Sequence, residues 1–200
     1  MKFSRETALE TVKGHFWRAG YQANNVKVLS AHLGITRSSF YNTFGSRKKL
    51  FCEVIDSYAA DLKNSQLYVI PVDKDFKPEV VQVFNNLCKM RALDVQHRGC
   101  LLVNSIAELS SSEVDNELSE HLDDIVKRSK AILANRIKVA IHAGEFYNDL
   151  DPNSLAMSLQ NLSYGTNLIS KVVHDEKSLW ESCDLILKGL GFKDRKVGRD

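Results

Sequence analysis

The stretch from Gly34 to Phe51, GITRSSFYNTFGSRKKLF, brings hydroxyl, amide and basic side chains together in a pattern that could bind a nucleic acid. Serine and threonine hydroxyls reach phosphates or base edges, and an asparagine amide can pair bidentately with adenine. The alternative interpretation is a solvated turn between two ordinary core helices, because short basic clusters are common on protein surfaces. Which of these two interpretations holds depends on the secondary-structure elements that carry the side chains.

Two short helices joined at Gly34 would position these side chains. Apolar spacing predicts one helix that ends before Gly34, and a second that Thr36 caps, with Phe40 and Phe44 on its inner face. Such a pair is a helix-turn-helix, whose second helix lies in the major groove of DNA. The side chains expected at the start and on the outer face of that helix are Thr36, Arg37, Ser38, Ser39 and Asn42.

Phosphate contacts are expected from the flanks of this helix. Tyr41 follows the inward Phe40 and therefore points outward, where its hydroxyl can reach a phosphate. Arg47, Lys48 and Lys49 open the next helix, where free backbone N–H groups and basic side chains together attract an anion.

The charge distribution agrees with a polyanion-binding N-terminus. Residues 1–60 hold nine Lys or Arg against four Asp or Glu, and the remaining residues hold eighteen against twenty-one. A basic head on a slightly acidic body is typical of nucleic-acid binding, although an excess of five charges is modest.

The rest of the chain predicts an all-α fold, with no repeat and no convincing strand. The expected helices run from Ser4 to about Gly20, from Ser46 to about residue 62, from Pro78 to about Val95, over Cys100–Leu109, over roughly 113–143, from 152 to about 173, and from about 176 to 188. Ser110–Ser112 and Asp151 are expected caps. Neither a secretory leader nor a membrane-length apolar run is found, which predicts a cytoplasmic protein that contacts no membrane.

The span from Gly20-Tyr21 through Leu33-Gly34-Ile35, Ser39-Phe40-Tyr41 and Phe44-Gly45-Ser46 to Leu50-Phe51 resembles the DNA-binding domain of TetR/AcrR-type transcriptional regulators. The resemblance implies a DNA-binding domain over residues 1–50, a linking helix from about 46 to 63, and an effector-binding and dimerisation domain over 51–200. It implies a homodimer that binds a double-stranded operator and is released by a small molecule. Tyr41 and Arg47 match phosphate-contacting positions, and Asn25 matches a contact at the start of the second helix.

The C-terminal body offers an apolar stripe that could form the dimer interface. The residues predicted for it are Leu155, Leu159, Leu162, Ile169, Leu179 and Ile186. Two helices that pair with their symmetry mates would build a four-helix interface. The alternative is that the same stripe fills an intramolecular core.

An effector pocket is expected from helices between about residues 80 and 170, because such pockets combine apolar walls with a few polar groups. The candidates are Phe84, Leu87, Cys88, Arg91, Cys100, Leu102, Asn104, Ile137, Ile141 and Tyr164. Plain core packing is the alternative for each of them.

Cys100 supports a sharper hypothesis, because it follows His97 and Arg98 at a predicted helix start, where the dipole and a cation favour the reactive thiolate. The chain could then sense electrophiles or oxidants. The alternative is an inert, buried cysteine.

No catalytic grouping or cofactor motif is found, and the four cysteines lack metal-ligand spacing. Glu117, His121 and Asp124 could line a metal at helical spacing, but a charged solvent face explains them better.

The predicted function is a ligand-responsive transcriptional regulator, most simply a repressor. The competing interpretations are a small helical enzyme or carrier, and a DNA-binding protein without a ligand.

Overall fold

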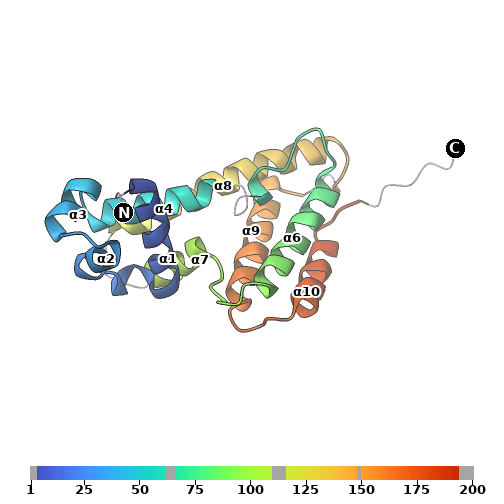
Figure 1. Cartoon of the computed structure of the whole chain (residues 1–200). Coiled ribbons are helices and arrows are strands. Elements are labelled where there is room, and N and C mark those ends of the chain that lie inside the picture. The colour runs from blue at the N-terminus through green and yellow to red at the C-terminus, as the bar shows by residue number, and fades with distance from the viewer. Residues whose placement is uncertain (1–3, 62–65, 110–115, 148–149, 194–200) are drawn as a thin grey trace. The chain divides into compact units, whose positions relative to one another are not determined.

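The structure is a computed structural model that describes residues 4–61, 66–109, 116–147 and 150–193. It confirms the predicted all-α fold (Figure 1), since the described ranges hold no strand and only an isolated antiparallel bridge between Phe146 and Phe192. In the same ranges no helix has both the length and the apolarity to span a membrane. The elements are α1 Arg5–Ala23, α2 Val26–Leu33, α3 Arg37–Phe44, α4 Arg47–Ala60, η1 Gln66–Tyr68, α6 Phe76–Ala92, α7 Leu101–Leu109, α8 Asn116–His142, α9 Pro152–Ile169 and α10 Glu176–Lys188.

The chain forms two compact units, which are described separately. Unit 1 falls within Met1–Asn64 and Cys100–Ile125, and unit 2 falls within Ser65–Gly99 and Val126–Asp200. Helix α8 therefore begins in unit 1 and ends in unit 2. These units reflect packing, so the functional boundary predicted at residue 50 stays a prediction.

The core of unit 1 forms where α1, α3, α4 and α7 bury their apolar faces. Val12 and Phe16 lie four residues apart on α1 and are fully buried, as is Phe40 on α3. The rings of Phe16 and Phe51 meet edge to face, with centroids 5.1 Å apart. This core holds the short helices α2 and α3, which are too short to be stable alone.

A kink at Gly20 ties α1 to α7 within unit 1. Gly20 has φ 76° and ψ −179°, so the helical hydrogen bonds are interrupted there. The carboxylate of Glu108 accepts hydrogen bonds from the backbone N–H groups of Tyr21, at 2.9 Å, and Gln22, at 2.8 Å. The freed donors are thus satisfied by a charged acceptor from another helix.

Unit 2 packs α6 against α9 and α10. Phe84 and Cys88 on α6, Leu159 on α9 and Cys183 on α10 are buried in one apolar cluster. Helix α6 ends at Ala92, before the expected Val95, and Asp94 then accepts hydrogen bonds from the backbone of Gln96 and Arg98.

The predicted caps in this part of the chain divide into two groups. The Asp151 carboxylate accepts from Ser154 N at 2.9 Å and caps α9, as expected. Ser110–Ser112, predicted to cap α8, lie outside the described residues.

Replacing Gly20 by alanine should destabilise the protein, because a Cβ there would lie 2.5 Å from the Glu108 carboxylate and the backbone conformation is one that alanine rarely adopts. We expect a loss of about 1–3 kcal/mol in the free energy of unfolding, measured by urea titration.

Gly14→Ala is the matched control in the same helix, since a Cβ at Gly14 meets only the end of Arg18, at 3.9 Å. It should raise stability by about 0.5–1 kcal/mol. Equal stability of the two variants would contradict the role assigned to the kink.

Candidate nucleic-acid interface

Helices α2 and α3 form the predicted helix-turn-helix, and both are capped as their sequences indicate. Asn25 Oδ1 accepts from Val28 N at 3.1 Å, and Thr36 Oγ1 accepts from Ser39 N at 3.1 Å. Gly34 closes α2 in the left-handed region, with φ 64° and ψ 31°. These three residues set the angle at which α3 leaves the turn.

The outer face of α3 presents the predicted DNA-contacting side chains to solvent. Thr36, Arg37, Ser38, Ser39, Tyr41 and Asn42 are all exposed, whereas Phe40 and Phe44 are buried. The Thr36 and Ser39 hydroxyls lie 3.0 Å apart and bond to each other. No hydrogen bond engages the side chains of Arg37, Ser38 or Asn42 within the described ranges, so these are the groups most available to bases.

Arg47 and Lys48 have partners within unit 1 that the sequence did not reveal. The Arg47 guanidinium lies over the Tyr21 ring, 3.8 Å from its centroid, and its Nη1 donates to Tyr21 O at 3.0 Å. Lys48 Nζ forms an ion pair with Glu117 at 2.6 Å. A phosphate contact from either residue would compete with these bonds, so their predicted contacts stay predictions.

A stacked histidine pair in unit 1 was missed by sequence reasoning, because the two residues come from different helices. The rings of His15 on α1 and His32 on α2 have centroids 3.8 Å apart. Burial, followed by the charges of His32 and Arg18, lowers the pKa of His15. Because the folded pKa is lowered, the fold favours the neutral form of His15. The stability that this preference contributes is present above the ordinary pKa of histidine and is lost as the pH falls through the folded pKa.

Two of the three residues that could line a metal and that we interpret as a charged solvent face, His121 and Glu117, have partners in unit 1. His121 Nε2 lies 2.9 Å from Asp56 Oδ1, and Glu117 pairs with Lys48. The described part of the chain holds no group of three or more His, Cys, Asp or Glu side chains that could bind a metal ion.

The comparisons with known proteins agree with this geometry. Residues 77–185, more than half of the chain, match the family model described as the tetracyclin repressor-like C-terminal domain. The chain belongs to the TetR family of transcriptional regulators. Its members are regulators and not enzymes, which excludes the enzyme interpretation.

Two relatives of low identity are described as HTH-type transcriptional regulators. The chain is 24% identical, over 88% of its length and 90% of the relative's, to the uncharacterised HTH-type transcriptional regulator YezE of Bacillus subtilis strain 168. It is 25% identical to the HTH-type transcriptional repressor BdcR of Escherichia coli K12, over 52% of its length and 53% of BdcR.

Solved structures share the fold over nearly the whole chain. A cysteine variant of the TetR family regulator CifR, complexed with 26-bp operator DNA, superposes with a TM-score of 0.80 at 23% identity and covers 94% of this chain and 97% of its own. A TetR family regulator from Cytophaga hutchinsonii superposes with a TM-score of 0.74 at 19% identity, over 95% and 96% of the two chains.

The predicted effector residues do not all fall in one unit. Phe84, Leu87, Cys88, Arg91, Ile137, Ile141 and Tyr164 lie in unit 2, whereas Cys100, Leu102 and Asn104 lie in unit 1. Phe84, Cys88 and Ile137 are fully buried in the unit 2 core. Arg91 is buried as well.

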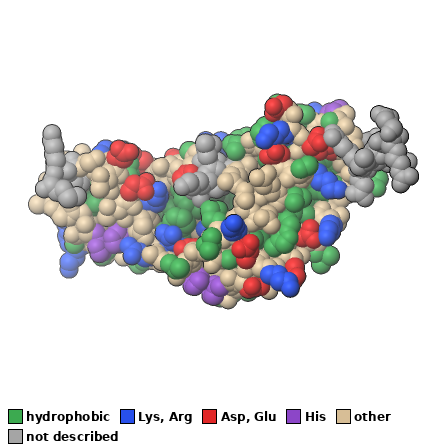
Figure 2. All heavy atoms as spheres, turned by 45° about the vertical axis from the view of Figure 1, so that its right-hand side comes forward, with side chains coloured by type: hydrophobic (Ala, Val, Ile, Leu, Met, Phe, Trp, Pro, Cys, Tyr) green, Lys and Arg blue, Asp and Glu red, His purple; other side chains and the backbone are tan. Residues whose placement is uncertain are grey.

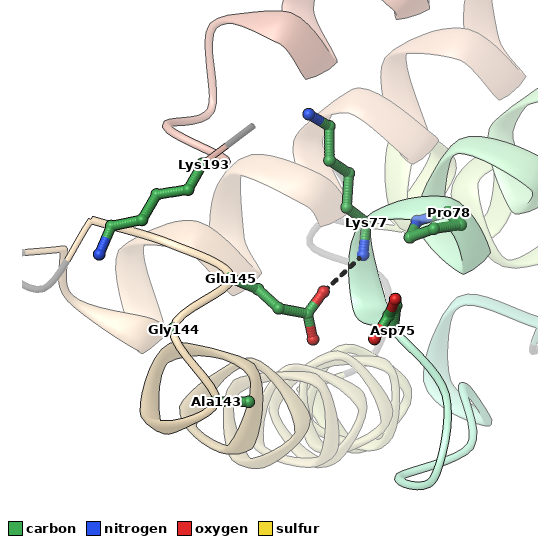
Figure 3. A pocket seen from close by; sticks show the side chains of 7 residues that line it. All are labelled: Asp75, Lys77, Pro78, Ala143, Gly144, Glu145 and Lys193. Carbon is green, nitrogen blue, oxygen red and sulfur yellow. Dashed lines mark hydrogen bonds between the residues drawn. The ribbon is translucent and has the colours of Figure 1, made fainter. Parts of the chain in front are cut away.

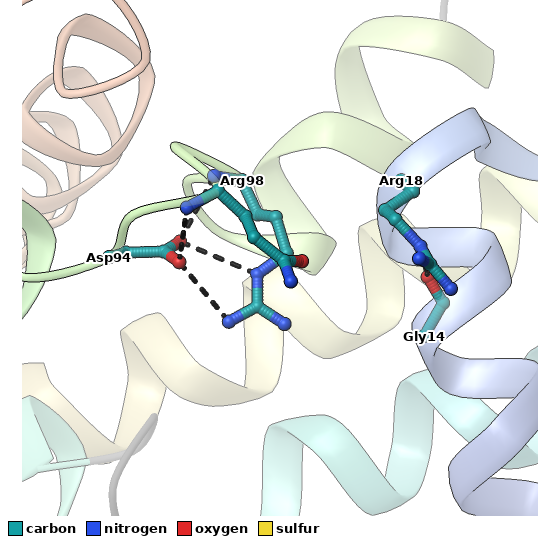
Figure 4. A network of polar contacts seen from close by, with 5 residues as sticks. Gly14, Arg18, Asp94 and Arg98 are labelled. Atoms are coloured by element: carbon teal, nitrogen blue, oxygen red, sulfur yellow. Dashed lines mark hydrogen bonds and ion pairs between the residues drawn. The ribbon is translucent and has the colours of Figure 1, made fainter.

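Cys100 precedes α7 directly and is partly buried against the core of unit 1. The Tyr58 hydroxyl donates to its Sγ across 3.4 Å. The charge of Arg98 is already paired, because Asp94 accepts from Arg98 Nη2 at 3.2 Å (Figure 4). Burial alone would raise the pKa of Asp94, but the hydrogen bonds and charge of Arg98 outweigh it and hold that pKa below its ordinary value.

Cys88 and Cys183 form a fully buried pair of thiols in unit 2. Cys88 Sγ donates to Cys183 Sγ at 3.7 Å, and the Thr166 hydroxyl lies 3.2 Å from Cys183. The hydrogen bond to Cys183, together with burial, raises the pKa of Cys88. Both thiols are buried, at 0% and 1% exposed, whereas Cys100 is partly exposed and is therefore the more accessible candidate for chemistry.

Helices α9 and α10 enclose an open groove of about 650 Å³. Of the predicted dimer residues, Leu162, Ile169, Leu179 and Ile186 line it. Leu155 and Leu159 do not line it and are buried in the core of unit 2, to which Leu162 and Leu179 also belong. Other large apolar side chains on or beside the two helices are exposed: Met157, Leu168, Val172 and Leu185. Apolar side chains also reach the surface among charged ones in Figure 2.

A second hollow in unit 2, of about 340 Å³, lies where α8 ends and α6 begins (Figure 3). Its central carboxylate, Glu145, points at the first turn of α6 and accepts from Phe76 N at 2.8 Å and Lys77 N at 3.2 Å. Glu145 thus caps α6, which explains the polar lining without a ligand.

Proposed function

We propose that the chain is a homodimeric repressor that binds a near-palindromic operator and is released by a small molecule or an electrophile. The observation that carries the DNA-binding part is the exposed, unengaged row of donors on α3, held outward by the buried Phe40 and Phe44. The CifR complex with operator DNA supports the same use of this fold. The repressor role is supported by the name of BdcR.

Residues 1–50 form the proposed DNA-binding domain, and residues 51–200 form the effector-binding and dimerisation domain. Arg37, Ser38 and Asn42 read bases, and Tyr41 contacts phosphate. Asn25, Thr36 and Ser39 orient the helices through their caps and add contacts to the backbone of the DNA. Arg47 and Lys48 supply positive charge beside this surface.

Tyr41→Phe should weaken DNA binding on all sequences by roughly 2- to 10-fold, because one hydrogen bond to phosphate is lost. Asn42→Ala should instead change which sequence is preferred. Both are measured by fluorescence anisotropy on an operator selected from random DNA, over a range of salt concentrations.

Tyr147→Phe is the matched control, since Tyr147 is 55% exposed in unit 2 and Tyr41 is 51% exposed on α3. Wild-type affinity in Tyr41→Phe, or equal losses in both tyrosine variants, would show that α3 is not the recognition helix.

The groove between α9 and α10 is the proposed dimer interface. Ile169 and Ile186 line it and are 48% and 44% exposed in the single chain, so a second copy would remove substantial apolar area from water. A helix-turn-helix protein needs two copies to read two half-sites, which supports the same conclusion.

Ile186→Asp should shift the protein from dimer to monomer, because an unpaired carboxylate would be buried in the interface. Sedimentation equilibrium measures the change. Val139→Asp on α8, where Val139 is 45% exposed, should leave the dimer intact. A dimeric Ile186→Asp variant would place the interface elsewhere.

The proposed ligand response needs only a modest coupling between effector and DNA. An effector that favours a dimer with wrongly spaced recognition helices changes operator affinity 5- to 150-fold at a coupling of about 1–3 kcal/mol. Titration of the operator complex with small molecules separates this regulator from a DNA-binding protein that has no ligand.

Release by an electrophile should depend on Cys100. N-ethylmaleimide should dissociate the operator complex of the wild type and of Cys52→Ser, another half-buried thiol, but not that of Cys100→Ser. Gel-shift titration measures the dissociation, and equal release from all three proteins would dismiss the hypothesis.

A further inference from the structure

Arg91 is a buried cation that lacks an anionic partner. It lies near the end of α6, is 6% exposed, and donates from Nε to Asn167 Oδ1 at 2.6 Å. No ion pair joins it to an acidic side chain, and the two terminal nitrogens of its guanidinium have no acceptor, in the part of the chain that the structure describes. These two nitrogens are not among the buried side-chain atoms without a partner, so they reach solvent, where an anion could pair the charge that the fold leaves unpaired.

The other buried arginine of unit 2 shows what a purely structural role looks like. Arg136, 7% exposed, donates from Nε to Pro71 O at 3.0 Å and from Nη2 to Lys74 O at 2.6 Å. Its guanidinium also lies 5.1 Å from the centroid of the Phe76 ring. Arg136 is satisfied by the fold, whereas Arg91 is held by one neutral amide.

Asn167 fixes Arg91 in place and cannot satisfy it. Its Nδ2 donates to Ser163 O at 2.8 Å, which directs its Oδ1 toward Arg91 Nε. The fork of the guanidinium is therefore oriented with its outer edge unoccupied. Two parallel N–H donors at such an edge match the two oxygens of a carboxylate.

A second unsatisfied group lies on the same face of α9. Gln160 precedes Asn167 by seven residues, or about 10 Å along the helix axis. It is 1% exposed, and its Nε2 donates to Tyr68 Oη at 3.4 Å and to Val126 O at 3.3 Å, while its Oε1 has no partner. Cys88 and Phe84, one and two turns before Arg91 on α6, are buried and apolar.

We propose that Arg91, oriented by Asn167, binds the carboxylate of a small organic acid, and that this acid is the effector class of the regulator. The body of the acid is apolar, to suit the core of unit 2, and a hydrogen-bond donor on it would satisfy Gln160. This inference rests on the proposed function only for its effect on DNA, because acid binding is measured without DNA.

The test compares hexanoate, octanoate and phenylacetate with their uncharged amides, on the full chain at constant ionic strength. At least one acid should raise the melting temperature of the wild type in a saturable way, and its amide should not. Arg91→Met should weaken binding of that acid by at least about 30-fold in calorimetric titration.

A second variant keeps the test decisive if Arg91→Met does not fold. Asn167→Asp places a carboxylate beside Arg91, so it should raise the melting temperature without ligand and abolish the response to acids. Asn86→Asp, the same change at an exposed position of α6, should do neither.

The proposal is overturned if no acid of the panel distinguishes the wild type from Asn167→Asp or Arg91→Met, or if acid and amide bind equally. In that case the proposed regulator function would still be supported if the separately measured binding to the operator is intact.

Discussion

The fixed position of Tyr21 is the constraint on which the N-terminal half of the fold depends. Its N–H donates to Glu108 of α7, its carbonyl accepts from Arg47 of α4, and its ring contacts both the Arg47 guanidinium and the Phe51 ring. Three helices thus meet at a single residue just after the kink in α1. Because α2 begins five residues later, the placement of the helix-turn-helix follows from how Tyr21 is held.

The local features of this region were predictable from sequence. Asn25, Thr36 and Ser46 cap helices with side chains that bond three residues ahead, and Gly34 takes the left-handed turn, so a short window contains all the necessary information. The pairing of Glu108 with Tyr21 spans 87 residues. No periodicity reports such a contact. The bond from Arg47 to Tyr21 O also joins two helices, across 26 residues, which is why Arg47 looked like a free cation in the sequence.

The C-terminal body shows a different limit of sequence reasoning. Helical spacing correctly identified the apolar stripe of α9, but the same spacing describes residues that face the core and residues that face a groove. Leu155 and Leu159 are covered by unit 2 itself, whereas Ile169 lies in the open groove with α10. Which neighbour covers a stripe depends on the tertiary packing, and hydrophobicity alone does not encode it.

The segment between α6 and α7 connects the surroundings of Arg91, where the proposed anion binds, to α7, which belongs to the same unit as the DNA-binding helices. Asn167 holds Arg91 through its side chain, and its carbonyl lies so close to Gly99 that a Cβ there would approach it to 2.7 Å. Gly99 is followed by Cys100 and then by α7, whose Glu108 anchors the kink in α1. A carboxylate bound at the outer edge of Arg91 would therefore act on the Arg91–Asn167 pair, whose asparagine packs against Gly99. Because Gly99 has φ 66° and lies this close to Asn167, a residue with a Cβ would not fit this position without displacing one of them.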